Sequence, residues 1–485
     1  MSTEKCEKFK GEIENYLSEN QDNFDSKIDN VFSSLRVRTL LSRCGIVKEQ
    51  GFHAAHVLFM LFMLPLLRLG TVHSFCKKQW EHWSSCGKDV FYRFKRKELR
   101  WRTFMAKLNL EIFHGIKLDE CPSEETYFVF DDTLLEKLGK KIENVSYLFD
   151  HNAGRTLLGF CIVTLGLLTG NGFYVPDFSY RFGKKRNSAT PERIGDPRSV
   201  SGRRSFEAKH STKLELALMM MGNAVSMGIC PGYVLFDSWY ACPCMIIRIR
   251  NMAEKSIHVI CRLKNGNIQY VYKNRLLTLA RLHRKIRKKY RKDKKTGLML
   301  ARITVRLQDS DEDVTIVFCK GYKEPEADTP TGRKKKKKKK REWTAFLSTD
   351  TSLHSSAVIK KYSKRWTTGV CYKECKQMLG LGRDQSNDFN ARVFATTASF
   401  MRYNLLNYLN QKENYETMGT LSEHLADDYA VITYSDRLWD FFRGLFLVSF
   451  KSVFGVFGIE EDFHSYVEAL TDALKDSTPI AGCET

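Results

Sequence analysis

The sequence predicts an α/β protein with helical regions at both ends, and two observations lead to the α/β core. The segments TYFVFD and GYVLFD are short, β-branched and aromatic, and each ends on an aspartate. Between them, STKLELALMMMGNAVSMG carries apolar residues three or four apart, the spacing of one helix face. Strands that alternate with helices are typical of a sheet covered by helices.

The first 122 residues are expected to be mainly helical. The most apolar stretch, Ala54 to Leu67, contains Pro65 and falls short of the ~20 residues that cross a bilayer, so a buried helix is predicted. The following segment, KDVFYRFKRKELRWRTFMAKLNLEIF, interleaves aromatic and basic residues. This pattern is compatible with a solvated basic face and with a face that contacts DNA.

Residues 255–350 are expected to be rich in strands, with IHVIC, IQYVY, ARITVRL, DVTIVF and WTAFLS as the segments concerned. Two basic tracts interrupt them. Arg281 to Lys295 contains ten Lys or Arg in fifteen residues, and Arg333 to Arg341 is entirely basic. Such tracts bind phosphates or remain solvated loops, and a loop is expected for the second. From Ser355 to the end the pattern is mostly helical.

The charge of the chain indicates a polyanionic partner. Its 485 residues include 78 Lys or Arg against 56 Asp or Glu, a net charge of +22. Such a chain repels itself unless a polyanion compensates, which favours nucleic acid. A membrane surface fits less well, because the basic residues are not gathered on one amphipathic helix.

The cysteines and the N-terminus indicate a cytoplasmic protein. The 14 cysteines include no CxxC pair and no zinc-site spacing, so reduced and mostly buried thiols are expected. The first residues, MSTEKCEKFKGEIENYL, lack the apolar core of a signal peptide.

Asp132 and Asp237 end the two predicted strands, and a strand end is a rigid place to mount a metal ligand. Phosphodiester chemistry with two divalent ions needs several carboxylates that converge on one point. A turn or a helix cap is the commoner role of such an aspartate, and Asp237-Ser238 fits a cap. Asp131 is an alternative to Asp132, because neighbours on a strand face opposite sides.

A third element lies further along the chain, where Tyr362, Arg365, position 369 and Lys376 follow one another at spacings of 3, 4 and 7. On a helix these spacings place all four on one stripe. The stripe has few apolar residues, so it is not a core face, and a solvated basic face is the alternative. Trp366 and the segment CYKECKQMLGLG indicate that another side of this helix is packed.

Three blocks resemble the insertion-sequence transposases of the IS-four group, which carry a DDE catalytic triad and a Tyr-Arg-Glu-Lys motif. The first is FVFDDTLLEKLGKKIENVSYLFDHNAGRTLLGF, and the second is GYVLFDSWYA. The third, YSKRWTTGVCYKECKQMLGLGRDQSNDFNARVFATTASFMRYNLL, has Tyr362, Arg365 and Lys376 in register with the motif. Together the blocks span roughly residues 126 to 420.

The resemblance implies an RNase H-like catalytic core interrupted by a β-rich insertion. The regions it implies are a DNA-binding helical N-terminal region at 1–122, the core at 123–254 and 351–420, the insertion with the basic tracts at 255–350, and a helical C-terminal region suited to dimerisation at 421–485.

The implied activity is that of a DNA transposase. It would cut at the terminal inverted repeats of its insertion sequence with Mg²⁺, for which Mn²⁺ substitutes, and join the 3′-hydroxyl ends to target DNA. Its partners would be double-stranded transposon ends and target DNA, without a membrane. Pairing two ends implies a homodimer, and the implied location is the bacterial cytoplasm, at the nucleoid.

Carried over residue by residue, the resemblance makes Asp132 and Asp237 the metal-binding acids. Asp132 is preferred to Asp131 because the ligand of the family directly precedes Thr, here Thr133. The implied role of Tyr362, Arg365 and Lys376 is to contact phosphates of the DNA end, which suits Arg and Lys by charge.

The chain departs from the family at the third acid, where Gly369 replaces the catalytic Glu and offers no ligand atom. Within a helix, Gly also costs about 0.5–1 kcal/mol relative to Ala. Glu374 lies about 140° around the helix from position 369, so it is not expected to substitute.

This departure leaves other functions open. One is a catalytically inactive, transposase-derived DNA-binding protein that occupies ends without cutting, and another is a metal-dependent endonuclease without strand transfer. Trp239, Trp343 and Trp366 have the chemistry to stack on an unpaired base, but each is more often a packing residue, and no role is assigned to them.

Overall fold

A computed structural model describes residues 27–67, 69–77, 86–151, 153–170, 172–184, 190–192, 195–252, 254–294, 296–322, 343–413 and 421. They form two compact units. Unit 1 takes the described residues up to Ile112, with 378–384 and those from Asn390 onward, and unit 2 takes Phe113–Gln377 with Gln385–Phe389. The second basic tract, and all but the first residue of the expected C-terminal region, lie outside the described residues. Among the described helices, none has the length and apolar character needed to cross a membrane.

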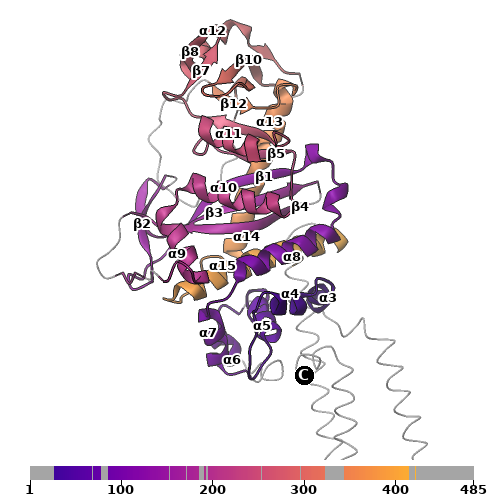
Figure 1. Cartoon of the computed structure of the whole chain (residues 1–485), viewed down its shortest axis with the longest axis vertical. Helices are drawn as coiled ribbons and strands as arrows, with labels where there is room; N and C mark the ends of the chain where they lie inside the picture. Colours follow the sequence, from indigo (N-terminus) through magenta and orange to yellow (C-terminus); the bar gives the residue numbers. More distant parts are fainter. Residues whose placement is uncertain are drawn as a thin grey trace, which may run out of the picture. The chain divides into compact units, whose positions relative to one another are not determined.

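Unit 1 is built from helices, as expected for the first part of the chain (Figure 1). Its helices are α3 (Lys27–Ser34), α4 (Val37–Arg43), α5 (Ala54–Leu66), α6 (Val72–Lys77), α7 (Lys88–Arg96), most of α8 (Trp101–Gly115) and most of α15 (Phe389–Glu413). The apolar stretch is the buried helix α5, which confirms that prediction.

A buried arginine completes the backbone hydrogen bonding of α5. Pro65 has no N–H, so the carbonyl of Leu61, four residues earlier, loses its helical donor. Arg402 of α15 donates to that carbonyl at 2.6 Å and to the carbonyl of Phe62 at 2.7 Å. The proline is therefore tolerated because α15 supplies the missing donor.

Unit 2 is built around one mixed sheet (Figure 1). Its strands are β1 (Tyr127–Glu136), β2 (Ser146–Asp150), β3 (Arg155–Thr169), β4 (Gly172–Arg181), β5 (Tyr233–Phe236), β6 (His258–Leu263), β7 (Gln269–Tyr272), β8 (Arg275–Thr278), β9 (Arg291–Lys292), β10 (Met299–Leu307), β11 (Asp313–Lys320) and β12 (Thr344–Ser348). The order is β2-β3-β1-β5-β6-β12-β11-β10-β7-β8, with β4 paired to β3 and β9 to β10. The pairs β1–β5 and β5–β6 are parallel, and the other pairs are antiparallel.

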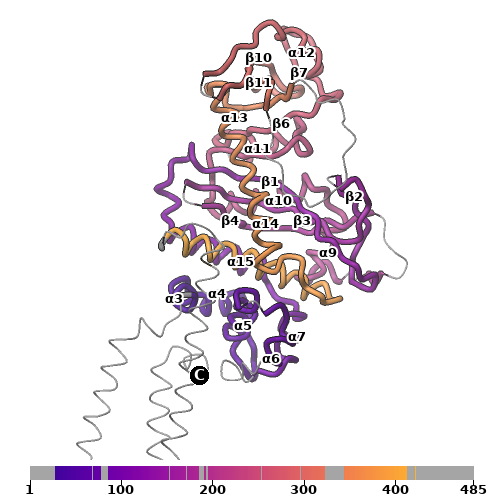
Figure 2. The backbone as a smooth tube through the Cα atoms, turned by 180° about the vertical axis from the view of Figure 1, so that it is seen from behind, coloured from indigo at the N-terminus to yellow at the C-terminus, as the bar shows by residue number. Residues whose placement is uncertain are grey.

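Helices cover both faces of this sheet, as the opposite views of Figures 1 and 2 show. The α-helices are α9 (Val200–His210), α10 (Lys213–Ser226), α11 (Pro243–Met252), α12 (Leu279–Ile286), α13 (Ser355–Ser363) and α14 (Thr367–Gln377). The 3-10 turns are η2 (Leu118–Glu120), η3 (Ser123–Glu125), η4 (Arg287–Lys289) and η5 (Lys364–Trp366). Helix α10 lies on one face of β3 and β1, and α14 lies on the other.

The central strand β1 changes character halfway along. Tyr127 to Phe130 are at most 2% exposed, as expected for a strand covered on both faces. From Asp131 to Leu134 the side chains are half-buried. The covering elements therefore leave access to β1 at the point where the aspartates begin.

Several predictions from the sequence are confirmed. The two strands that end on aspartate are β1 and β5, although β1 continues past Asp132 to Glu136, and the helix predicted between them includes α10. The five predicted strand segments of residues 255–350 correspond to β6, β7, β10, β11 and β12. Two details differ. The first basic tract contains a helix, α12, and the expected single helix of the third block is divided into α13, η5 and α14.

Candidate functional site

Asp237 follows β5 at the same level of the sheet as Asp131 of β1. The parallel pairing ends with Phe130 opposite Phe236, so the next residue on each strand is an aspartate. The Oδ1 atom of Asp237 accepts the N–H of Trp239 at 2.8 Å, which closes a turn directly after the strand. The next helix, α11, begins only at Pro243, so Asp237 stabilises a turn rather than capping that helix.

Asp132 lies on the face of β1 that α10 covers, and three side chains donate to its carboxylate. Lys213 Nζ lies 2.7 Å from Oδ2 and Tyr240 OH lies 3.1 Å from Oδ1. The Cys161 thiol donates more weakly to Oδ2, at 3.6 Å. Both oxygens of Asp132 therefore have protein donors, and one of these donors is a cation.

The start of α10 fixes the position of Lys213. The Thr212 side chain accepts the N–H of Glu215 at 3.2 Å, and the Glu215 carboxylate accepts the N–H of Thr212 at 2.7 Å. This capping box starts the helix at Lys213. The Lys213 ammonium also lies 4.8 Å from the ring centroid of Trp239, which is 51% exposed.

The electrostatics around Asp132 favour a charged lysine. Burial lowers the pKa of Lys213, but Cys161 and Asp132 outweigh it, so the pKa is raised overall. Burial, together with the neighbouring carboxylates of Asp132 and Asp131, raises the pKa of Tyr240 well above its usual value. Tyr240 therefore stays a neutral hydroxyl and donates its proton to Asp132.

Asp131 points to the opposite face, where it meets Arg365 of η5. Arg365 Nη1 lies 2.8 Å from Oδ2 of Asp131, and the N–H of Asp132 donates to Oδ1 at 2.9 Å. Burial raises the pKa of Asp131 to about 7, with Asp132 and Asp237 adding to the rise and Arg365 opposing it. A carboxyl group with this pKa is only partly ionised at neutral pH, and a further cation beside it would lower the pKa.

Helix α14 is attached to the same face of the sheet. Lys376 Nζ donates to Thr133 Oγ1 at 2.7 Å and to the carbonyl of Leu134 at 3.1 Å. The hydroxyls of Tyr372 and Thr164 lie 2.5 Å apart, which joins α14 to β3. The two basic residues predicted to contact DNA, Arg365 and Lys376, thus bind β1 in this structure.

The remaining residues of the third block are placed differently from one another. Tyr362 is 1% exposed and packs against Phe346, with ring centroids 4.8 Å apart. Gly369 lies in the first turn of α14, and a Cβ there would meet only the Trp366 ring, at 3.9 Å. Burial raises the pKa of Glu374, which lies further along α14. A Cβ at position 369 would therefore make only ordinary van der Waals contact with its nearest neighbours.

The acids are candidates for part of a metal site. Among the described residues, no group of three or more His, Cys, Asp or Glu is arranged to hold a metal ion. Asp237 lies level with Asp131 and adds to the rise in its pKa, whereas Asp132 faces α10. Mg²⁺ often takes only one or two carboxylates, with phosphate and water as its other ligands. Asp131 and Asp237 are the acids whose positions fit an ion held in that way. They do not fit a three-acid set, because position 369 has no carboxylate.

Sequence reasoning missed the donors around Asp132. Lys213, Tyr240 and Cys161 are 81, 108 and 29 residues from Asp132 in the chain. The available signals were local. Lys213 opens a predicted helix, and Tyr240 lies in the second block, GYVLFDSWYA.

Residues 77–315 match a family model described as DDE superfamily endonuclease. The matched segment contains Asp131, Asp132, Lys213 and Asp237. Over just under half of the chain, the match supports similarity to a DDE transposase-like family, and the mixed α/β fold is consistent with it. DDE superfamily nucleases generally use divalent metal ions. A comparison with curated proteins finds no match.

Proposed function

We propose that this chain is an insertion-sequence transposase of the IS-four group, which binds terminal inverted repeats and performs Mg²⁺-dependent cleavage and strand transfer. The observation that carries the proposal is the point where the parallel pairing of β1 with β5 stops, at Phe130 and Phe236. Asp132 and Asp237 lie there, within the segment that matches a DDE endonuclease. The net charge of +22 favours a DNA substrate.

An RNase H-like core is part of this proposal. Its support is the strand order β4-β3-β1-β5-β6, antiparallel on one side of β1 and parallel on the other. The strands between β6 and α13 support the proposed insertion, and they continue the same sheet through β12. The proposed regions are those expected from the sequence, with N-terminal DNA binding at 1–122 and dimerisation at 421–485.

The proposed roles of the residues follow from their partners. A bound Mg²⁺ would stabilise the attacking and leaving oxygens of the phosphodiester. Tyr240 and Lys213 orient the carboxylate of Asp132, and the turn at Trp239 orients that of Asp237. Arg365, whose guanidinium now binds Asp131, is suited to a bidentate phosphate contact.

The other two motif residues, Lys376 and Tyr362, are also proposed to contact DNA, with different support for each. Lys376 is proposed to contact the DNA end through its charge. Tyr362 is proposed for the same contact by position in the motif, and its burial means that a change in α13 must accompany DNA binding. We further propose that the protein works as a homodimer at the bacterial nucleoid, because two ends must be paired.

A second candidate is a catalytically inactive derivative that occupies DNA ends without cutting. Two observations favour it. Gly369 supplies no third carboxylate, and each aspartate of β1 is compensated by a protein cation, Asp131 by Arg365 and Asp132 by Lys213. A metal ion would have to compete with these cations for the oxygens.

The experiment that tests both candidates uses the purified full chain. Its binding to duplexes that carry the inverted repeats flanking its gene is compared with binding to random duplex across a salt series. Tighter binding to the repeats supports both candidates, and equal binding contradicts both. Cleavage with Mg²⁺ or Mn²⁺ followed by joined products supports the transposase. Cleavage without joined products indicates a nuclease, and binding without cleavage supports the inactive derivative.

A further inference from the structure

The first basic tract forms one exposed surface at an end of the sheet of unit 2, where α12 lies beside β8 and β10 (Figure 1). We call it the α12 patch. Its residues all have exposed side chains: Arg281, Arg284, Lys285, Arg287, Lys288, Lys289, Arg291 and Lys292. They come from α12, η4 and β9.

The patch stands on a packed helix rather than on a solvated loop. Leu279, Leu282 and Ile286 of α12 are at most 2% exposed, and their spacing of three and four places them on one helix face. Arg281 and Lys285 lie on the opposite face at the same kind of spacing. Runs of like charge are usually disordered. This run is folded, so its cations have defined positions.

Aromatic contacts hold the patch from its inner side. The His283 ring stacks on Trp343, with centroids 4.4 Å apart and planes at 18°. His283 Nε2 lies 3.1 Å from Tyr290 OH, and Lys320 lies 4.8 Å from the Tyr290 ring centroid. Residues on both sides of η4 are therefore fixed to strands β11 and β12 or their flanks.

The charge of the patch is uncompensated within the described part of the chain. The sequence from Arg275 to Lys292 contains no Asp or Glu. Across the described residues, none of the eight cations of the patch forms an ion pair. Holding like charges together on one rigid element raises the free energy of the folded chain unless a polyanion binds there.

The geometry of the patch fits one class of polyanion. From Arg281 to Lys288 the chain runs through α12 into the 3-10 turn η4 and rises by about 12 Å, the length along the duplex axis of three or four base-pair steps at about 3.4 Å each. Membrane-surface helices add exposed aromatic anchors. Here Tyr290 and Trp343 are half-buried and contact His283.

We propose that the α12 patch is a second DNA-binding surface, which takes the phosphate backbone of duplex DNA without reading its sequence. The proposal rests on the proposed function only for the identity of the ligand as DNA. It uses neither the aspartates nor a metal ion. By positioning duplex DNA, such a surface would raise affinity uniformly across sequences.

The test measures how salt weakens the binding of a random-sequence duplex to wild type and to a variant. The NaCl concentration runs from 50 to 200 mM, roughly the range over which phosphate contacts weaken strongly. The variant is the full chain with Arg281→Gln, Arg284→Gln, Lys285→Gln and Lys288→Gln. Each lost contact reduces the slope of log K against log salt by about 0.9, so the slope should become shallower by about two to four. The affinity at low salt should fall about tenfold or more.

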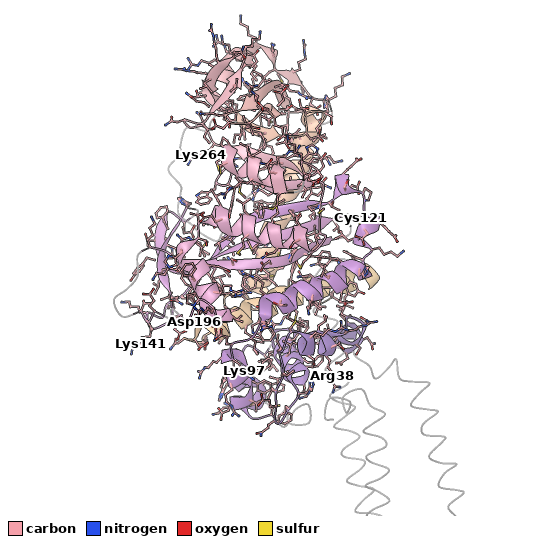
Figure 3. All side chains as sticks on the ribbon, viewed as in Figure 1. Arg38, Lys97, Cys121, Lys141, Asp196 and Lys264 are labelled. Atoms are coloured by element: carbon pink, nitrogen blue, oxygen red, sulfur yellow. The ribbon has the colours of Figure 1, made fainter. Side chains whose placement is uncertain are left out.

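A matched control removes the same charge elsewhere in unit 2. It carries Lys140→Gln, Lys141→Gln, Lys184→Gln and Lys264→Gln, at exposed positions outside the patch. Lys141 and Lys264 are labelled in Figure 3. The control should keep the wild-type slope to within about 0.5. The double variant Arg281→Gln/Lys288→Gln should show about half the loss of the quadruple variant, which gives a second measurement if the larger change affects folding.

The result that overturns the proposal is a wild-type slope in both patch variants, or an equal loss in the control. A loss confined to RNA, or to vesicles of anionic lipid, would also overturn it. The outcome is separable from the proposed function. If the patch variant has a shallower slope but the chain shows no preference for inverted repeats, the patch is supported and the transposase is contradicted. If the chain prefers inverted repeats but the patch variant keeps the wild-type slope, only the patch is contradicted.

Discussion

Asp131 and Asp132 are neighbours of identical chemistry, yet β1 places them in two different environments. Asp132 faces α10, where Lys213, Tyr240 and Cys161 donate to it. Asp131 faces the α14 side, where it pairs with Arg365. The alternation of side chains along a strand therefore assigns each acid its own cation. The two acids therefore do not form a pair, and Asp237 lies level with Asp131 rather than with Asp132.

Arg365→Gln should have the largest effect on stability. Arg365 and Asp131 have 11% and 23% side-chain exposure, and breaking a buried pair costs about 3–5 kcal/mol, so about 3 kcal/mol is expected for this partly buried one. Arg365→Lys should retain part of this stabilisation, because a cation remains beside Asp131. Chemical unfolding at pH 8 measures both variants, and an equal loss in the two would contradict the ion-pair account.

The loss in Arg365→Gln should depend on pH. The pKa of Asp131, already raised to about 7, rises further without the guanidinium. A raised folded-state pKa contributes stability at low pH that is lost as pH rises through it. The two proteins should therefore lose stability together between pH ~4 and pH ~7, and the variant should fall below wild type only as the pH rises above about 7, where Asp131 ionises first in wild type. A loss that is the same below pH ~7 as above it would show that Asp131 is not the partner that matters.

Lys213→Met should destabilise the chain by about 2 kcal/mol, because hydrogen bonds to charged groups contribute about 1.5–3 kcal/mol. It should also free Oδ2 of Asp132, so that Mn²⁺ binds more tightly, by about tenfold if about 1.4 kcal/mol of competition is removed. Mn²⁺ titration followed by electron paramagnetic resonance measures the affinity. Unchanged Mn²⁺ affinity would mean that Lys213 does not compete for the carboxylate.

Lys376→Met should cost about 1–2 kcal/mol, since it removes the two hydrogen bonds that attach α14 to Thr133 and Leu134. Lys360→Met is the matched control, because Lys360 is exposed on the neighbouring helix α13. Thermal unfolding should separate the two variants. Similar melting temperatures would indicate that the hydrogen bonds of Lys376 contribute little.

Cys161→Ala should have the smallest effect, below about 1 kcal/mol for the hydrogen bond, because a thiol is a weak donor and lies 3.6 Å from Asp132. Tyr240→Phe, which removes the stronger donor to the same carboxylate, should cost more. The ranking is read from unfolding free energies of the two variants. A larger loss in Cys161→Ala would point to packing rather than hydrogen bonding as its contribution.

The sequence alone predicts the strands and the aspartates well, because apolar runs that end on an acid depend on local pattern. It also predicts α5 and α10, whose apolar spacing and caps are local. It does not predict the partners of the acids. Lys213 is 81 residues from Asp132 and Arg365 is 234 residues from Asp131, and only the folded sheet brings them together.

The third block shows a different limit. Its spacing predicts one stripe on one helix, but the chain tightens into η5 at Lys364–Trp366, so Tyr362 and Gly369 belong to different helices. A 3-10 turn changes the angle per residue, which spacing counted at 3.6 residues per turn does not register. The sequence does not predict helix α12, because its buried residues Leu279, Leu282 and Ile286 lie beside and among basic residues. A run of basic residues is usually a solvated loop.

We propose, from the resemblance, that Asp132 rather than Asp131 is the metal-binding acid of a DDE centre that lacks its third carboxylate, although Asp237 lies level with Asp131. The direct test is Mg²⁺-dependent cleavage of inverted-repeat DNA by Gly369→Glu, alone and combined with Asp132→Asn or Asp131→Asn. We expect Gly369→Glu to cleave more than the natural chain, Asp132→Asn to abolish this cleavage, and Asp131→Asn only to reduce it. Cleavage that survives Asp132→Asn and is lost with Asp131→Asn would contradict the account.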